Sequence, residues 1–374
     1  MTPSLPDTPL KSAPNASLSR LNAVRIFVVL MITFGYASTM PIGPGNPEIL
    51  RHFGYDPSWY GVQVLFFISG YLGLRSLERH GSIKLYLKSR ALRNIPVLGV
   101  YTLATITVLY PIFCKPGGDL ATEVVKLSKY FVETVSLIRP GQRLPGLLED
   151  ARYMCLIQGA IWTLRWGAVA HIGLCIGWHL KILQSKYALL AVCWLAIATY
   201  IAATLYSIGV QDFVFEPEIP GVRVGYAFLA GATVFAWKDS LPTRLRSHML
   251  ILLGLFSLAF CHFYFVTWTP LIEVFTSGFW AYLTLILILV PLRATNWLKN
   301  WPNLTAALYM SHWPITQILL LKFPETNPGE MVAMSLTCTV LIAWLTHFAI
   351  TGRLNSIVTR LLSSNAKPVK ANTP

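Results

Sequence analysis

Arg25 and Tyr36 are separated by eleven positions within an apolar stretch, Leu21 to Met40, which reads LNAVRIFVVLMITFGYASTM. Eleven residues make about three turns of an α-helix, so both side chains would lie on one face. About 20 residues, at a rise of about 1.5 Å each, are enough to cross a bilayer. A guanidinium and a phenol on one face indicate a polar seam that is turned toward protein. An Arg and a Tyr anchored at opposite membrane interfaces would give the same pattern.

Two later stretches carry groups that can bind a substrate. GVQVLFFISGYL places Ser69 before Gly70, a pair that allows a neighbouring helix to approach closely. YLKSRALRNIP carries Lys88, Arg90 and Arg93, and the last two are one helical turn apart. Arginine binds two phosphate oxygens at once, so this cluster suits the phosphates of a soluble donor. An anchor on anionic lipid is the alternative.

Two more stretches place ionisable groups inside apolar runs. IWTLRWGAVAHIG carries Arg165 and His171, and LYMSHWPI carries His312. An arginine in hydrocarbon needs a partner or a water-filled cavity. A lone histidine in a membrane helix is as often a hydrogen bond between helices as a catalyst. We expect Arg25, Ser69, Arg165 and His312 to meet around one cavity.

The composition indicates an integral membrane protein. The 374 residues are 54% hydrophobic and 12% charged, with a mean hydropathy of +0.55, whereas soluble domains carry about 25% charged residues. The net charge of +14 is spread over short clusters between apolar runs, which favours membrane topology over nucleic-acid binding. The six cysteines form no CxxC pair, so we predict neither a metal site nor a disulfide framework.

Apolar runs and charge bias predict an all-α fold, with about ten transmembrane helices in one bundle and both termini in the cytoplasm. Even-numbered connections are basic, and odd-numbered ones are poorer in base or richer in acid. The third connection, about 115–159, is long enough to cover an outward-facing cavity. We predict a disordered N-terminus (1–19), a membrane domain (20–350) and a basic cytoplasmic tail (351–374). The predicted spans are 20–41, 59–77, 95–114, 160–182, 187–208, 222–237, 248–267, 271–293, 303–322 and 330–350.

Taken in order, the motifs RIFVVLMITFGYA, GVQVLFFISGYL, YLKSRALRNIP, IWTLRW and LYMSHWPI resemble the membrane-bound acyltransferase family 3, the O-antigen acetylase-like proteins. The resemblance runs from about residue 18 to 350, and ten spans is that family's count. It implies transfer of an acyl group, often acetyl from acetyl-CoA, to a sugar hydroxyl of a surface or exported glycan. It also implies a bacterial-type inner membrane or another cell membrane. The residues that match the family's motifs are Arg25, Ser69, Gly70, Arg90, Arg93 and His312.

The sequence departs from the family at the expected acid/base pair. The first-span histidine falls on Tyr36 and the fourth-span glutamate on Gly167, and Gln63 stands where an aspartate is common. A sugar hydroxyl is a poor nucleophile and needs a base held against it. Tyrosine, with a reference pKa of about 10, removes protons poorly at pH 7, and glycine cannot act at all.

His171 lies four residues after Gly167, one turn further along the same helix face. It could supply the missing imidazole, with Tyr36 as hydrogen-bond donor or oxyanion stabiliser. The resulting site prediction has two parts. The predicted catalytic residues are Tyr36, His171, Arg25 and His312, and the predicted donor-binding residues are Lys88, Arg90, Arg93 and Ser69.

Three functions remain open. The first is a working acyltransferase, in which acetyl-CoA or another acyl-CoA enters from the cytoplasm and a glycan or lipid-linked sugar enters from the outer side. The second is a catalytically degenerate member that binds a donor or glycan, or serves as a partner of an active enzyme of glycan assembly. The third is a transporter of a lipid-linked sugar, against which stand the few ionisable groups in the spans and the lack of an inverted repeat. Membrane lipid is a partner in all three.

Overall fold

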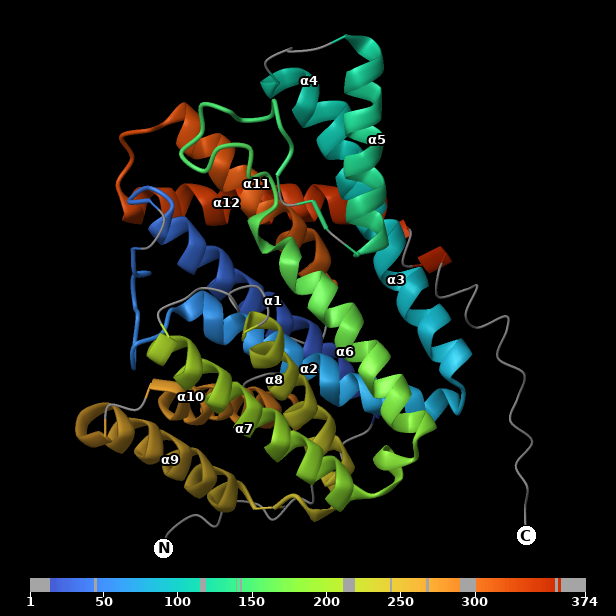
Figure 1. Ribbon diagram of the computed structural model, residues 1–374, viewed down its shortest axis with the longest axis vertical. Coiled ribbons are helices and arrows are strands. Elements are labelled where there is room, and N and C mark those ends of the chain that lie inside the picture. Colours follow the sequence, from blue (N-terminus) through green and yellow to red (C-terminus); the bar gives the residue numbers. More distant parts are fainter. Residues whose placement is uncertain are drawn as a thin grey trace, which may run out of the picture.

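The computed structural model describes residues 14–43, 46–114, 119–138, 140–141, 143–210, 219–242, 244–266, 269–289, 301–353 and 356–357. Within these ranges the fold is all-helical apart from isolated β-bridges in the loops, as the sequence predicts (Figure 1). The α-helices are α1 (Pro14–Thr39), α2 (Pro57–His80), α3 (Ile83–Ala104), α4 (Tyr110–Phe113), α5 (Leu120–Ser136), α6 (Trp162–His179), α7 (Lys186–Val210), α8 (Ile219–Ala236), α9 (Leu245–Cys261), α10 (Thr269–Leu289), α11 (Thr305–Lys322) and α12 (Pro328–Thr346).

Among the described residues, seven helical segments are long and apolar enough to cross a membrane. They lie in α1, α3 with α4, α6, α7, α9, α10 and α12. Helices also occupy the other three predicted spans, as α2, α8 and α11, but these are not among the seven. Both α2 and α11 bury most of their side chains inside the protein, where polar groups such as Gln63 and His312 face protein instead of lipid. Seven apolar helices are therefore shown, and ten crossings stays a prediction.

Helices α1 and α2 lie at the centre of the molecule (Figure 1). α1 packs against α2, α10, α11 and α12, and α2 packs against α8 and α10. Helices α2 and α8 cross closely: a Cβ on Gly70 would overlap the carbonyl oxygen of Phe228, and one on Gly231 would overlap that of Phe67. Each backbone fits against the other because both positions are glycine, which confirms that the Ser69-Gly70 pair admits a neighbouring helix.

The basic segment after α2 is helical and belongs to α3, so this helix begins well before the predicted span 95–114. Gly81 adopts φ 60° and ends α2, and Ser82 caps α3 by accepting a hydrogen bond from the Leu85 amide at 3.5 Å. Helix α3 therefore begins at Ile83, and Pro96 lies inside it instead of at the start of a span. Lys and Arg are good helix formers, so a charged run marks one side of the membrane without ending a helix.

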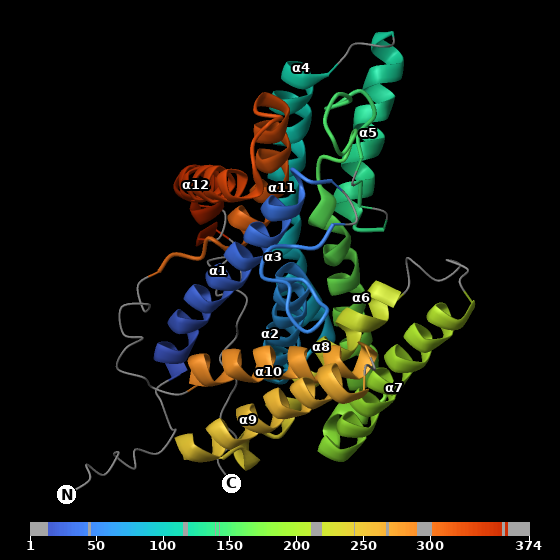
Figure 2. The ribbon, with the colours of Figure 1, turned by 90° about the vertical axis from the view of Figure 1, so that its left-hand side faces the viewer.

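The third connection contains a helix, α5, that the sequence analysis did not predict. Asp119 caps its start through the Thr122 amide, and α5 packs along α3 (Figure 2). The loop that follows folds back onto α11, where the Trp313 indole donates to the Leu156 carbonyl oxygen at 3.0 Å. This loop thus supports the helix that carries His312.

The predicted terminal segments are only partly described. α1 begins at Pro14, inside the segment 1–19 that we predicted as disordered, and residues 1–13 lie outside the described ranges. Of the tail 351–374, residues 351–353 and 356–357 are described. The cytoplasmic placement of both termini rests on the charge pattern and stays a prediction.

Candidate active site

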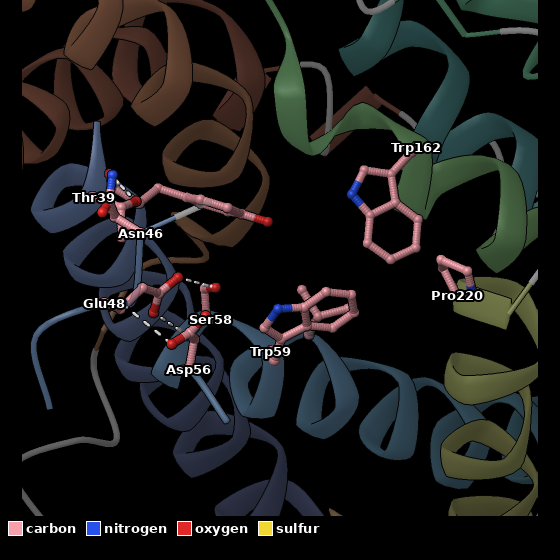
Figure 3. Close-up of a pocket in the computed structure, with 10 residues that line it drawn as sticks. Thr39, Asn46, Glu48, Asp56, Ser58, Trp59, Trp162 and Pro220 are labelled. Carbon is pink, nitrogen blue, oxygen red and sulfur yellow. Dashed lines mark hydrogen bonds between the residues drawn. The ribbon is translucent and has the colours of Figure 1, made fainter. Parts of the chain in front are cut away.

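A cavity of about 390 Å³ lies where the C-terminal end of α1 meets the N-terminal ends of α2, α6 and α8. Figure 3 shows polar side chains on one side of it and aromatic rings with a proline on the other. Under the predicted topology these helix ends are on the outer face. The lining residues are Tyr36, Thr39, Asn46, Glu48, Asp56, Ser58, Trp59, Val62, Trp162 and Pro220.

Tyr36 is the one predicted catalytic residue in this lining, and His312 lies directly against it. Their rings are stacked with centroids 5.9 Å apart, and Trp313 meets the Tyr36 ring edge-on at 4.9 Å. His312 is fully buried, and its Nδ1 lies 2.8 Å from the Tyr309 carbonyl oxygen. A carbonyl only accepts, so Nδ1 carries the proton. Nε2 is then the basic nitrogen, and it is buried with no hydrogen-bond partner in the part of the chain that the structure describes.

A carboxylate that the sequence analysis did not select, Glu48, lies in the same cavity. Its side chain reaches from the α1–α2 connection to the start of α2, where it accepts hydrogen bonds from the Ser58 amide at 2.8 Å and from the Ser58 hydroxyl. The residue is 6% exposed. Burial raises the pKa of this carboxyl from 4.5 to about 7, against the opposing effect of the two Ser58 hydrogen bonds.

Asp56 holds the loop that carries Glu48. Its Oδ1 accepts from the Glu48 amide at 3.2 Å and lies 3.8 Å from the Arg51 Nε. The Arg51 guanidinium also donates to the Gly54 carbonyl oxygen. These contacts fix the backbone of the connection, so the Glu48 carboxylate enters the cavity from a defined direction.

The opposite wall is aromatic. The rings of Trp59 and Trp162 are 6.4 Å apart between centroids, and they face the carboxylates across the cavity (Figure 3). Arg223 on α8 supports this wall, because its guanidinium carbon lies 3.6 Å from the centroid of a Trp59 ring. Aromatic faces opposite a few polar groups are typical of small-molecule sites.

Arg223 belongs to a buried polar network beneath the cavity. Its side chain pairs with Glu273, whose carboxylate also accepts from Gln63 and Tyr200. Both partners are nearly fully buried, with side chains 6% and 1% exposed. The network joins α2, α7, α8 and α10 and explains Gln63: an amide donates to Glu273, which an aspartate at that position would repel.

A second group of charges lies at the other end of α1. Arg25 is within electrostatic range of Arg90 and Arg93, and Arg79 lies close to Arg93. Arg90 donates to the Leu72 carbonyl oxygen at 3.3 Å, while its Nε and that of Arg25 are buried and have no hydrogen-bond partner among the described residues. Arginines that repel one another and have unsatisfied N–H donors favour the binding of a polyanion.

His171 lies in the middle of α6 and is not among the described residues that line the cavity. Its Nδ1 is 2.6 Å from the Tyr86 hydroxyl, and its ring packs edge-on against Phe228. Tyr86 in turn lies under the Arg90 guanidinium, 5.2 Å from ring centroid to carbon. His171 therefore contacts Arg90, one of the predicted donor-binding residues, through Tyr86, and its role as the base stays a prediction.

The remaining predicted residues do not converge on the cavity. Arg165 is exposed, with its guanidinium over Trp166, which corrects the expectation that it meets Arg25, Ser69 and His312 around one cavity. Ser69 is half-buried in α2 and Lys88 is exposed on α3. We expected Arg165 to be buried because it lies in an apolar run. At an exposed helix face, however, the long Arg side chain can reach water. A Cβ on Gly167 would meet no atom within 4 Å.

The sequence analysis missed Glu48 and Arg223, because the residues next to them in the sequence do not indicate a role in a site. Glu48 lies in a connection, where acids were counted only for membrane topology. Its site depends on Gly35 and Ser58, which lie 13 and 10 positions away.

Comparison with known proteins agrees with the motifs. No curated protein and no solved structure matches the chain at a significant level. A family model described as an acyltransferase domain, of acyltransferase family 3, matches residues 18–348. Its span covers the arginine group at one end of α1 and the cavity at the other. The chain therefore belongs to acyltransferase family 3 and is an integral membrane protein of that family.

Proposed function

We propose that this protein is a membrane O-acyltransferase that moves an acyl group, acetyl in the simplest case, from acyl-CoA to a sugar hydroxyl of a surface or exported glycan. The supporting observation is the two-ended arrangement of α1. Near the start of α1, Arg25 lies within electrostatic range of Arg90 and Arg93. Near its end, Tyr36 lines a cavity with carboxylates and aromatic rings. The two residues are about 16 Å apart along the helix.

At the inner end, Arg25, Arg90 and Arg93 would bind the phosphates of CoA. The Nε atoms of Arg25 and Arg90 are buried with no hydrogen-bond partner among the described residues, which is unfavourable, and a phosphate oxygen would supply an acceptor. Ser69 and Lys88 stay in this proposal as further donor contacts. The acyl thioester would then extend along α1 toward Tyr36.

At the outer end, the cavity suits a sugar. An aromatic ring packs against the apolar face of a pyranose, and side-chain oxygens and amides bind its hydroxyls. Trp59 and Trp162 supply the rings, and Asn46 and Asp56 supply polar groups on the facing wall. We propose this cavity as the site of the acceptor, either a free glycan or a lipid-linked sugar.

Tyr36 and His312 would act at the junction between donor and acceptor. The Tyr36 hydroxyl is a donor suited to stabilising the oxyanion of the tetrahedral intermediate. His312, stacked on Tyr36, holds that ring in place and keeps a basic nitrogen nearby. Arg25 would orient the donor from the other end of the same helix.

A catalytically degenerate family member is the second candidate, and Gly167 favours it. The family carries a glutamate there, whereas this chain leaves open space around the Cβ position. Such a protein would bind the donor or the glycan, or partner an active enzyme, without transferring the acyl group.

Purified protein distinguishes the two candidates through acetyl-CoA binding by calorimetry and release of the CoA thiol in the presence of glycan. The active enzyme predicts binding together with acceptor-dependent thiol release. Binding without release would contradict catalysis and support the degenerate member, and an absence of binding would favour the transporter. Tyr36→His combined with Gly167→Glu is a further check, because turnover that appears only in this double variant would identify the present form as inactive.

A further inference from the structure

The Glu48 carboxylate packs against the backbone of α1 at Gly35. A Cβ on Gly35 would overlap the Glu48 carboxylate, so the acid fits against the helix backbone only because residue 35 has no side chain. The next residue, Tyr36, lines the cavity together with Glu48. The glycine at position 35 thus allows the Glu48 carboxylate to lie close to Tyr36, the residue that stands where the family has a histidine.

The two oxygens of Glu48 are positioned by the start of α2. Ser58 is the second residue of that helix, so its amide is one of those that lack a partner within the helix. Glu48 accepts from this amide and from the Ser58 hydroxyl. A carboxylate oxygen has further lone pairs, so these bonds orient Glu48 without using all of its acceptor capacity.

We propose that Glu48 is the general base of this enzyme, in place of the histidine and glutamate that Tyr36 and Gly167 replace; the inference rests on the acyltransferase function proposed above. Glu48 lines the acceptor cavity, whereas His312 lies behind Tyr36 and is not among the described residues of the lining. Asp56 is the other carboxylate in the lining, but it is engaged by Arg51 and by the Glu48 amide.

In the proposed step the acyl group moves from sulfur to oxygen, while one proton moves to Glu48 and back. The Glu48 carboxylate takes the proton of the acceptor hydroxyl while the hydroxyl oxygen attacks the thioester carbonyl carbon. The tetrahedral intermediate collapses with cleavage of the C–S bond, and the CoA thiolate leaves. Glu48 returns its proton to the thiolate, which yields the ester, free CoA thiol and the original carboxylate.

The surroundings of Glu48 suit this role near neutral pH. The charged and titratable groups that face it are Tyr36 from α1 and Asp56 from its own connection, with Arg51 paired to Asp56 and Arg223 of α8 in electrostatic contact with Tyr36. With a pKa of about 7, Glu48 is a stronger base than an ordinary carboxylate and is still half ionised at pH 7.

The test compares wild-type protein with Glu48→Gln and Glu48→Asp, using acetyl-CoA as donor and either water or a panel of sugars as acceptor. Glutamine keeps an oxygen for the Ser58 amide but cannot take a proton, so we expect thiol release to fall by about 100-fold or more with acetyl-CoA affinity unchanged. Aspartate keeps the carboxylate and should retain part of the rate. Glu325→Gln, at an exposed turn, is the matched control and should match wild type.

The pH profile separates catalysis from a capping role. Glu48 acts as the carboxylate, which forms above its pKa, so the wild-type rate should rise with pH through about 7. The Glu48→Gln rate should lack this rise. If Glu48→Gln does not fold, as loss of acetyl-CoA binding would reveal, a wild-type profile without a rise near pH 7 overturns the proposal.

Two outcomes distinguish the inference from the function beneath it. Wild-type turnover with an equal rate and equal pH profile in Glu48→Gln would overturn Glu48 as the base and leave the acyltransferase intact. Acetyl-CoA binding without wild-type turnover at any pH, with all acceptors, would contradict the acyltransferase itself and remove the inference with it.

Discussion

Single side chains divide the proposed chemistry between the two ends of α1. Arg25, Arg90 and Arg93 repel one another where a polyanion would relieve them. Tyr36 and Glu48 lie about three turns away, in a cavity with aromatic and polar walls. In the proposed reaction the same helix would fix the distance between the donor phosphates and the reacting carbonyl, and each end can be tested separately.

Replacing both Arg90 and Arg93 with Ala should weaken acetyl-CoA binding. Each charge-assisted hydrogen bond contributes about 1.5–3 kcal/mol, so the loss of two predicts a rise in Kd of about a hundredfold or more. The salt dependence of binding should also weaken because fewer ion pairs form. Calorimetry at two salt concentrations measures both effects. Arg246→Ala, on an exposed face of α9, is the control, and unchanged binding in the double variant would remove the donor-site assignment.

His171→Ala tests whether this histidine is a base or a support for the donor site. The contacts from His171 to Tyr86 and from Tyr86 to Arg90 predict a higher KM for acetyl-CoA with little change in kcat. The sequence-based hypothesis of an imidazole base predicts the reverse, a lower kcat with KM unchanged. Steady-state kinetics at several donor concentrations decides between them.

The sequence selected Arg90, Arg93 and Tyr36 because a charged run and a departure from a motif are local features, and the structure places the two arginines near Arg25 and Tyr36 in the cavity lining. It did not predict Glu48, whose position depends on Gly35 and Ser58 from two other segments. It placed Arg165 in the interior, whereas the side chain is exposed. A periodic pattern gives the face of a residue but not what that face contacts.

Among the helices, the close crossing of α2 and α8 positions the cavity. Trp59 lies in the first turn of α2 and Pro220 in the first turn of α8, so the gap between the two helix starts depends on how tightly the helices pack further along. Glycines at the crossing set that distance, and the Arg223–Glu273 pair connects the same helices to α10.

Gly231→Ala should destabilise the protein. The new Cβ would overlap the backbone of α2 at Phe67, which cannot move as a flexible side chain does, so we expect a loss of about 1–3 kcal/mol. Gly225→Ala, on the same helix, meets no atom within 4 Å and should be neutral or stabilising by up to about 1 kcal/mol. Thermal unfolding in detergent compares the two, and equal Tm values would contradict the close crossing.

Glu273→Gln should also destabilise the fold, because it leaves the buried Arg223 charge without its counterion. Breaking such a pair costs about 3–5 kcal/mol. Glu133→Gln removes the partner of Lys129 in an exposed pair on α5 and should cost about 1 kcal/mol or less. The difference in Tm between the two variants measures the contribution of burial. Similar losses of Tm would show that the buried Arg223–Glu273 pair stabilises the fold no more than the exposed Lys129–Glu133 pair.

Helix positions were largely predictable, since apolar runs of bilayer length identify spans without tertiary information. The misses have physical causes. α3 continues through a basic segment because Lys and Arg favour helix, and α5 is amphipathic instead of apolar, so hydropathy did not reveal it. Helices α2 and α11 carry polar residues because they are buried among other helices.

Across the whole molecule, the proposal requires donor and acceptor to enter from opposite faces. The charge pattern predicts that the arginine end of α1 is cytoplasmic and the cavity end is external. The loop after α5 packs on α11 through Trp313, which also contacts Tyr36 of the cavity lining, and the covering of the cavity by the third connection stays a prediction. Sidedness of the reaction is therefore the most direct consequence of the architecture.

Sealed vesicles from cells that make the protein provide the decisive measurement, with acetyl-CoA labelled in its acetyl group added outside. In inverted vesicles the arginine end faces the added donor, and we predict that label appears in the enclosed glycan and that Glu48→Gln abolishes it. In sealed right-side-out vesicles we predict no labelling. Equal labelling in both orientations, or labelling confined to right-side-out vesicles, would contradict an acyl group that passes from one end of α1 to the other.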